Sequence, residues 1–231
     1  MSLSSPPNLR TRIKICGLTR EQDVDAAVEA GADAVGFVLY PPSPRAVSAE
    51  RAAALAARLP PFVTPVLLFV DARTEVTMRA LATVPGAIAQ FHGDESPARC
   101  REASGGGAYR FLRAARIPLG AAGAGFDLVK YASDFSHAQA ILLDAHVDGY
   151  GGGGKAFDWS LLSTAVDAHL VLSGGLTPAN VADGIRQLRP RCKSLAVDVS
   201  SGVEASKGIK DAAKIRDFVA AVRAADRAFP A

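Results

Sequence analysis

"RIKICGLTREQDVDAAVEAG", residues 12–31, distinguishes between two parallel-sheet architectures for this chain. It opens with a β-rich run (12–18) and continues into an amphipathic helical pattern (20–31) with acidic residues in its first turn and a glycine at its end. An open doubly wound sheet more often carries a glycine-rich fingerprint directly after its first strand. Here "CGLTRE" contains one glycine, Gly17, which favours a barrel over an open sheet.

The same alternation of a short strand and an alanine-rich helical segment continues along the chain. Helical patterns cover 48–59, 177–188 and 210–225. In the pattern over 177–188, Thr177 is expected to be the N-cap and Pro178 the first helical residue. Eight strand-helix units in 231 residues predict a single (βα)8 barrel over 12–231, with the open doubly wound sheet as the alternative. The eight predicted strands are 12–18, 34–38, 64–70, 87–93, 109–115, 140–145, 169–175 and 194–200.

Composition and charge narrow the class of protein. The chain is 49% hydrophobic and 21% charged, as is typical of a globular protein with a substantial core. Its net charge is +3, and the basic residues are scattered rather than gathered in a tract, so nucleic acid is not an expected partner. A small anionic ligand remains compatible with this charge, and the pI lies near 8.9.

The cysteines and the amino terminus indicate the compartment. Cys16, Cys100 and Cys192 lie far apart without a Cys-x-x-Cys pair, which argues against a disulfide framework and a zinc site and indicates a reducing compartment. Residues 1–11 lack the apolar core of a secretion signal and are expected to form a flexible leader. No apolar run is long enough to span a bilayer, so we expect a cytoplasmic protein without a membrane partner.

A glycine run, "DGYGGGGKAFDW" (148–159), resembles part of a nucleotide-binding P-loop. A P-loop needs Ser or Thr after its lysine to bind magnesium, and Ala156 follows Lys155 here. We therefore expect residues 149–154 to form a loop after the sixth strand, a mobile lid rather than a nucleotide site.

Strand parity predicts which side chains enter the barrel. Ile13 and Ile15 should face the helices, which turns Lys14 and Cys16 inward and leaves Cys16 at the carboxyl-terminal rim, where such barrels carry their active sites. A lone cysteine is more often a small buried apolar residue than a reactive group.

Further polar residues reach the same rim by the same rule. Asp144 and Asp198 should point inward from the sixth and eighth strands, Gln90 and His92 from the fourth, and Lys14 and Asp198 should pair between neighbouring strands. An aspartate at a strand end is often only a helix cap, and a histidine is often structural. The convergence of Cys16, Asp144 and Asp198 on one rim favours a functional site, with His92 and Asp198 contacting its substrate.

Two loops at this rim have the pattern of anion sites. "SGGLTPANV" places Gly174 and Gly175 after the seventh strand, and "DVSSGVE" places Ser200, Ser201 and Gly202 after the eighth. Backbone N–H groups in these two loops bind phosphate in many barrels, although each loop alone can also be a tight turn. Together they favour a phosphorylated small molecule as the substrate.

Eight segments along the chain form a recognisable set: "KICGLT" (14–19), "SPR" (43–45), "QFHGDE" (90–95), "LLDA" (142–145), "FDW" (157–159), "LSGGLTPANV" (172–181), "VDVSSGVE" (197–204) and "KD..KI..F" (210–218). Together they resemble the phosphoribosylanthranilate isomerase family over nearly the whole chain from Arg12, in the family's order. The resemblance implies a (βα)8 barrel that isomerises N-(5-phosphoribosyl)anthranilate to the 1-deoxyribulose 5-phosphate product in tryptophan biosynthesis, an Amadori rearrangement that needs no metal and no cofactor.

The resemblance also implies roles for single residues. Cys16 corresponds to the family's general base, Asp144 to its general acid and Arg45 to the arginine that binds the anthranilate carboxylate, while the glycines and serines of the two anion loops correspond to its phosphate site. At neutral pH this chemistry requires a lowered pKa for the Cys16 thiol and a raised pKa for the Asp144 carboxyl.

Three alternatives remain at this point. Another phosphosugar enzyme on the same barrel, such as indole-glycerol-phosphate synthase or a histidine-pathway isomerase, would need a catalytic lysine or an aspartate pair where strand one offers Cys16. A non-catalytic phosphate-binding barrel would need the anion loops but not Cys16 and Asp144 together. A P-loop NTPase is disfavoured by Ala156. The oligomeric state is expected to be a monomer or a weak homodimer.

Overall fold

The computed structural model describes residues 10–145 and 166–229. The leader residues 1–9 and the segment 146–165, which contains the glycine run expected to be a lid, lie outside the described residues. Within the described ranges, no helix is both long and apolar enough to cross a membrane.

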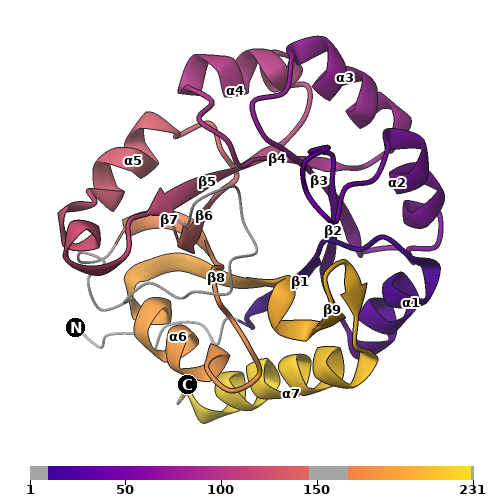
Figure 1. The fold of residues 1–231 in the computed structure, drawn as a ribbon. Coiled ribbons are helices and arrows are strands. Elements are labelled where there is room, and N and C mark those ends of the chain that lie inside the picture. Colours follow the sequence, from indigo (N-terminus) through magenta and orange to yellow (C-terminus); the bar gives the residue numbers. More distant parts are fainter. Residues whose placement is uncertain (1–9, 146–165, 230–231) are drawn as a thin grey trace.

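Eight parallel strands close into a barrel in the order of the chain. Figure 1 looks along this barrel, with the strands as an inner ring and the helices around them. Strands β1 and β8 pair with each other and close the ring, so the predicted (βα)8 barrel is confirmed. The strands are β1 (Arg12–Cys16), β2 (Ala34–Val38), β3 (Thr64–Phe69), β4 (Ile88–Phe91), β5 (Phe111–Ile117), β6 (Ala140–Ala145), β7 (Val166–Leu172) and β8 (Cys192–Val199).

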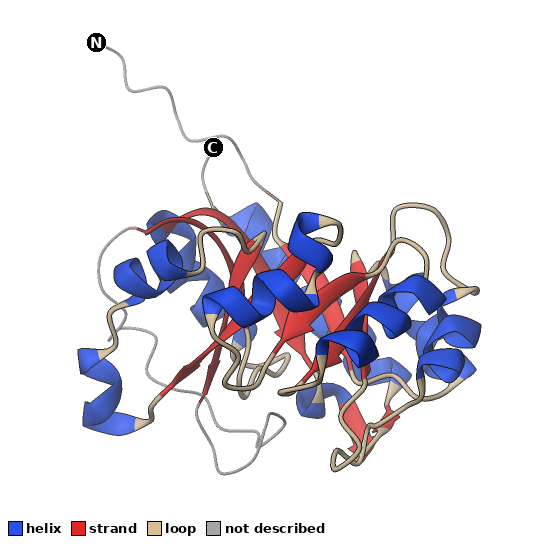
Figure 2. Ribbon diagram, turned by 90° about the horizontal axis from the view of Figure 1, so that it is seen from above, coloured by secondary structure: helices blue, strands red, loops and turns tan. Residues whose placement is uncertain are grey.

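Helices cover the outside of the barrel, as the side view in Figure 2 shows. They are α1 (Glu21–Ala30), α2 (Ala49–Ala56), α3 (Thr74–Thr83), α4 (Pro97–Ala103), α5 (Leu128–Asp134), α6 (Val181–Leu188) and α7 (Ala212–Ala228). After β8, the 3-10 turn η5 (Ser201–Val203) leads into a small antiparallel hairpin of β9 (Glu204–Ser206) and β10 (Ile209–Lys210). This hairpin therefore lies beyond the carboxyl-terminal rim of the barrel.

Local capping marks one end of several helices. Helix α1 ends at Gly31, whose φ of 92° is left-handed, and the Ser48 side chain caps α2 by accepting a hydrogen bond from the Arg51 N–H. The Asp211 carboxylate caps α7.

The predicted start of α6 at Thr177 is wrong, because the helix begins at Val181. The Asn180 side chain accepts a hydrogen bond from the Thr177 N–H and donates one to the Gly175 carbonyl oxygen. These two bonds hold the segment in a turn, and the turn keeps the loop after β7 close to the barrel rim.

The core has an outer and an inner part. Ile13, Ile15 and Val197 belong to the large apolar cluster between the strands and the helices. Leu142 packs with Ala114 and Val171 in a small separate cluster inside the barrel. This division confirms the predicted strand parity, since Leu142 lies one layer below the inward-facing Asp144.

The segment that precedes β1 is held against the barrel by hydrogen bonds and an ion pair. Thr11 is fully buried, its N–H and hydroxyl donate hydrogen bonds of 3.0 and 2.6 Å to the two carboxylate oxygens of Asp226 on α7, and Arg10 forms an ion pair with Asp33. These contacts join the beginning of the barrel to the last helix.

Candidate active site

Cys16, Asp144 and Asp198 all lie at the carboxyl-terminal rim of the barrel. Cys16 is the last residue of β1, and each aspartate stands next to the end of its strand, β6 or β8. The three residues are buried, with 4 to 6% of their surface exposed. Strands β7 and β8 lie between β6 and β1, so both predicted anion loops stand between Asp144 and Cys16.

A buried ion pair lies beneath Cys16. Lys14 Nζ is 2.8 Å from Asp198 Oδ1, and the Ser173 hydroxyl donates to Asp198 Oδ2 at 3.3 Å. Burial alone would lower the pKa of Lys14, but Asp198 and Cys16 outweigh burial and raise this pKa, so the ammonium stays charged. The predicted pairing between strands one and eight is confirmed.

Gly36 on β2 shows how close this ammonium is to the thiol. A Cβ placed on Gly36 would lie 2.7 Å from Cys16 Sγ and 3.1 Å from Lys14 Nζ. Both atoms therefore lie over the same glycine, which has no side chain to separate them. A larger residue at this position would force the sulfur and the ammonium to move.

Burial dominates the acidity of Cys16. It raises the pKa of the Cys16 thiol above its ordinary value, and the neighbouring Lys14 ammonium opposes this effect without overcoming it. Asp198 raises the same pKa further, whereas Lys210 lowers it. The expected lowering of the thiol pKa is therefore wrong, because desolvation outweighs the local positive potential.

Asp144 is held by a chain of polar contacts that comes from β4. His92 Nε2 lies 2.9 Å from Asp144 Oδ2, and Gln90 Nε2 lies 3.0 Å from His92 Nδ1. Asp144 Oδ1 accepts a hydrogen bond from the Ala145 N–H at 3.0 Å. His92, predicted as a substrate contact, thus has Asp144 and Gln90 as direct partners, and both oxygens of Asp144 are fixed.

The two predicted anion loops lie against each other and against Asp144. Gly202 packs so closely on the Leu176 carbonyl oxygen that a Cβ there would lie 1.9 Å from it. Gly174 has a φ of +76°, and a Cβ at this position would lie 2.8 Å from Asp144 Oδ1. The structure thus brings together Gly174, Gly175, Ser200, Ser201 and Gly202 in two adjoining loops after β7 and β8.

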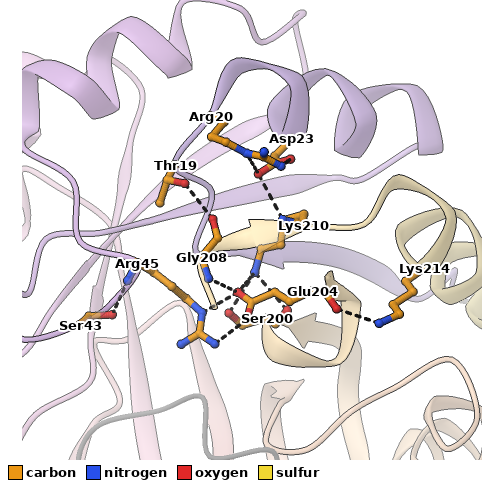
Figure 3. A network of polar contacts seen from close by, with 10 residues as sticks. All are labelled: Thr19, Arg20, Asp23, Ser43, Arg45, Ser200, Glu204, Gly208, Lys210 and Lys214. Atoms are coloured by element: carbon orange, nitrogen blue, oxygen red, sulfur yellow. Dashed lines mark hydrogen bonds and ion pairs between the residues drawn. The ribbon is translucent and has the colours of Figure 1, made fainter. Parts of the chain in front are cut away.

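Arg45 lies in the loop after β2 and is bound by a residue that the sequence analysis missed. Its Nε and Nη2 donate to the two carboxylate oxygens of Glu204 at 2.7 and 2.8 Å, and both side chains are buried. Lys210 Nζ donates to Glu204 Oε1 at 2.8 Å and to the Ser200 carbonyl oxygen at 3.0 Å. Figure 3 shows Glu204 between Arg45 and Lys210, beside Ser200.

Glu204 holds one edge of the Arg45 guanidinium and leaves the other edge available. Burial alone would raise the pKa of the Glu204 carboxyl, but hydrogen bonds from Arg45 and Lys210 outweigh burial and hold this pKa below its ordinary value. A guanidinium offers two edges for paired hydrogen bonds, and Glu204 occupies the one formed by Nε and Nη2. The edge formed by Nη1 and Nη2 is the one that can bind a ligand carboxylate.

The arrangement of possible metal-ligating side chains shows whether the described residues could hold a metal ion. Among residues 10–145 and 166–229, no group of three or more His, Cys, Asp or Glu side chains is arranged to hold a metal ion. The three cysteines, Cys16, Cys100 and Cys192, are all free thiols.

The closed parallel barrel, with Cys16, Asp144 and Asp198 at its carboxyl-terminal rim, places the chain among the (βα)8-barrel enzymes. Comparison with known proteins gives the family. Residues 13–221 match the family model described as N-(5'phosphoribosyl)anthranilate (PRA) isomerase. The chain belongs to this family.

Individual relatives agree with the family match. The N-(5'-phosphoribosyl)anthranilate isomerase of Methylibium petroleiphilum is 62% identical over 218 residues, which are 94% of this chain and 96% of the relative. The crystal structure of phosphoribosyl anthranilate isomerase from Thermus thermophilus is 31% identical, with a TM-score of 0.78 over 93% of this chain and 99% of that one. Another similar structure, of a phosphoribosyl anthranilate isomerase in complex with reduced 1-(o-carboxyphenylamino)-1-deoxyribulose 5-phosphate, is 35% identical and has a TM-score of 0.73, with coverage of 93% and 99%.

We predict that Glu204→Gln raises KM for phosphoribosylanthranilate by about tenfold, equivalent to ~1.4 kcal/mol, with a smaller change in kcat. The amide has one acceptor oxygen and an NH2 group in place of the second oxygen, so it cannot accept the paired hydrogen bonds from Nε and Nη2, and the guanidinium loses its fixed orientation. Steady-state kinetics with thermal unfolding as a folding check measure this effect. Glu21→Gln is the matched control, because Glu21 binds Arg51 in an exposed pair. An unchanged KM in a folded Glu204→Gln protein would contradict the prediction.

A second prediction concerns the pH dependence of the thiol. Lys14 lowers the thiol pKa and Asp198 raises it, so Lys14→Met should move Cys16 ionisation to higher pH and Asp198→Asn should move it to lower pH. The rate of Cys16 alkylation by iodoacetamide, followed by peptide mass spectrometry across pH, reports ionisation without requiring activity. Shifts in the same direction for both variants would show that the buried pair does not tune this thiol.

Proposed function

We propose that this chain is a phosphoribosylanthranilate isomerase in which Cys16 is the general base and Asp144 the general acid. One observation carries the assignment of roles. The two residues point into the barrel at one rim, on either side of the adjoining anion loops of β7 and β8. A substrate anchored by its phosphate in those loops would have its sugar within reach of both residues.

The chemistry follows from these two groups. Asp144 protonates the furanose ring oxygen, the bond from that oxygen to C1′ breaks, and the anilino nitrogen lone pair forms an iminium. The iminium acidifies the neighbouring carbon, and Cys16, in the fraction of molecules in which it is a thiolate despite its raised pKa, removes the C2′ proton to give an enolamine. The enolamine then tautomerises to the ketone product.

The remaining site residues bind the two ends of the substrate. Gly174, Gly175, Ser200, Ser201 and Gly202 would hold the phosphate through backbone N–H groups, as loops at this position do in related barrels. Arg45 would bind the anthranilate carboxylate through the edge that Glu204 leaves available. Asp198, predicted to contact the substrate, would act on the reaction through its pairing with Lys14 beneath Cys16.

A cytoplasmic location is part of the proposal. The three free cysteines suit a reducing compartment, where unpaired thiols persist.

Cys16→Ser should lower kcat at least about 100-fold, because a hydroxyl is a poor base at neutral pH and a positioned base contributes 10²- to 10⁴-fold. The assay mixes purified protein with freshly generated phosphoribosylanthranilate and follows the loss of anthranilate-type fluorescence. Cys100→Ser, at another buried cysteine, is the matched control and should retain activity. A Cys16→Ser protein with more than about a tenth of the wild-type kcat would remove Cys16 from the role of base.

For the oligomeric state, we propose a monomer or at most a weak homodimer. Among the described residues, the large apolar side chains that are exposed stand on separate elements rather than in one patch: Phe62, Val76, Val129 and Ile209. Analytical ultracentrifugation at micromolar concentration should give the mass of one chain. A stable dimer would contradict this expectation. If Phe62→Ser converts that dimer to monomers, the interface lies at the loop that contains Phe62.

A further inference from the structure

The chain of contacts behind Asp144 begins at a glutamine that neither the mechanism nor the substrate contacts use. Gln90 is fully buried inside the barrel, and His92, two residues further on, is 4% exposed. The Gln90 side-chain nitrogen faces His92 Nδ1 at 3.0 Å, and the opposite ring nitrogen faces Asp144 Oδ2 at 2.9 Å. Three buried polar groups from two strands are thus connected in a line.

The orientation of the Gln90 amide determines which ring nitrogen of His92 carries the proton. The amide nitrogen of Gln90 has the imidazole as its hydrogen-bond partner. Its carbonyl oxygen Oε1 is buried and has no hydrogen-bond partner among the described residues. Reversing the amide would satisfy that oxygen but leave both amide N–H groups without the imidazole partner. Unpaired buried N–H groups are rarer than under-satisfied carbonyl oxygens, so the amide donates to Nδ1.

We propose that Gln90 is a positioning residue that fixes the His92 tautomer with its proton on Nε2, so that His92 donates a hydrogen bond to Asp144. This proposal rests on the proposed function of Asp144 as the general acid. A neutral imidazole has one donor and one acceptor nitrogen, and an N–H aimed at Nδ1 makes that nitrogen the acceptor. His92 Nε2–H then points at Asp144 Oδ2.

The catalytic value of this arrangement appears when Asp144 loses its proton. The proton leaves a carboxyl oxygen for the furanose oxygen, and a buried carboxylate is formed. His92 donates to Oδ2 and the Ala145 N–H donates to Oδ1, so each oxygen has a donor already in place for the developing charge. Hydrogen bonds to a carboxylate are stronger than those to its neutral acid, so the line from Gln90 stabilises the transition state, in which the carboxylate forms, more than the ground state in which Asp144 is protonated.

The first part of the test reads the tautomer directly. Protein labelled with ¹⁵N-histidine is examined by NMR without substrate at pH 7.5, and His92→Asn identifies the His92 signals among those of the four histidines. The expected spectrum shows His92 Nε2 protonated and Nδ1 unprotonated. A spectrum with the proton on Nδ1 would overturn the proposal. Because no substrate is present, this result is independent of whether the chain is an isomerase.

The second part measures the consequence for turnover with Gln90→Met, which keeps the length of the side chain but removes the donor. We expect kcat for phosphoribosylanthranilate to fall about tenfold or more while KM stays within about twofold, since a preorganised donor acts mainly in the transition state. Gln187→Met on α6 is the matched control, because it makes the same change at another glutamine with an unpartnered buried oxygen.

The outcomes separate the two proposals. A wild-type protein without isomerase activity would end the proposed function but leave the tautomer result valid. An active wild type with a Gln90→Met variant of unchanged kcat would end the positioning role alone. If Gln90→Met fails to fold by circular dichroism, the wild-type tautomer still decides the inference.

Discussion

The buried ion pair between Lys14 and Asp198 lies at the seam where the barrel closes and forms part of the environment of Cys16. The two residues are register partners where β1 meets β8, the seam at which the first and last strands join. Both side chains are about 5% exposed, and moving two ions out of water costs several kcal/mol each, which their attraction only partly recovers. Such a pair contributes little net stability, but removing one partner leaves a buried charge. The seam is therefore coupled to the chemistry beside it, because the same ammonium that pairs with Asp198 lies against Cys16.

Other cations at the rim also form ion pairs with carboxylates. Among its described cations, Lys14 faces Asp198, while Arg45 and Lys210 share Glu204. Asp198 neutralises Lys14, whereas Arg45 and Lys210 share a single carboxylate, so part of one positive charge remains beside Ser200. The proposed phosphate site would combine this charge with backbone N–H groups in the loops after β7 and β8, whose dipoles require no counter-charge. The close contact between Gly202 and the Leu176 carbonyl oxygen keeps these two loops together.

The sequence predicted the barrel and its rim because strand parity is a local property. Ile13 and Ile15 alternate with Lys14 and Cys16, and this pattern alone gave the inward direction that the structure confirms. The start of α6 could not be found in this way. Thr177 and Pro178 have the local form of a helix start, but the Asn180 side chain binds back to the loop and delays the helix to Val181. A side chain that competes for backbone hydrogen bonds overrides propensity here.

The site was less predictable because its energetics depend on contacts between distant parts of the chain. Arg45 and Glu204 are 159 positions apart, and Glu204 begins β9, a strand of three residues that is too short for a periodic pattern to mark its direction. Parity did place a cation next to Cys16, but it could not show how completely the folded barrel removes water from the sulfur. That desolvation raises the thiol pKa although Lys14 lowers it. The amount of thiolate therefore depends on the balance between this desolvation and the ammonium that lies near the sulfur over Gly36, and that balance follows from three-dimensional packing rather than from any local stretch of sequence.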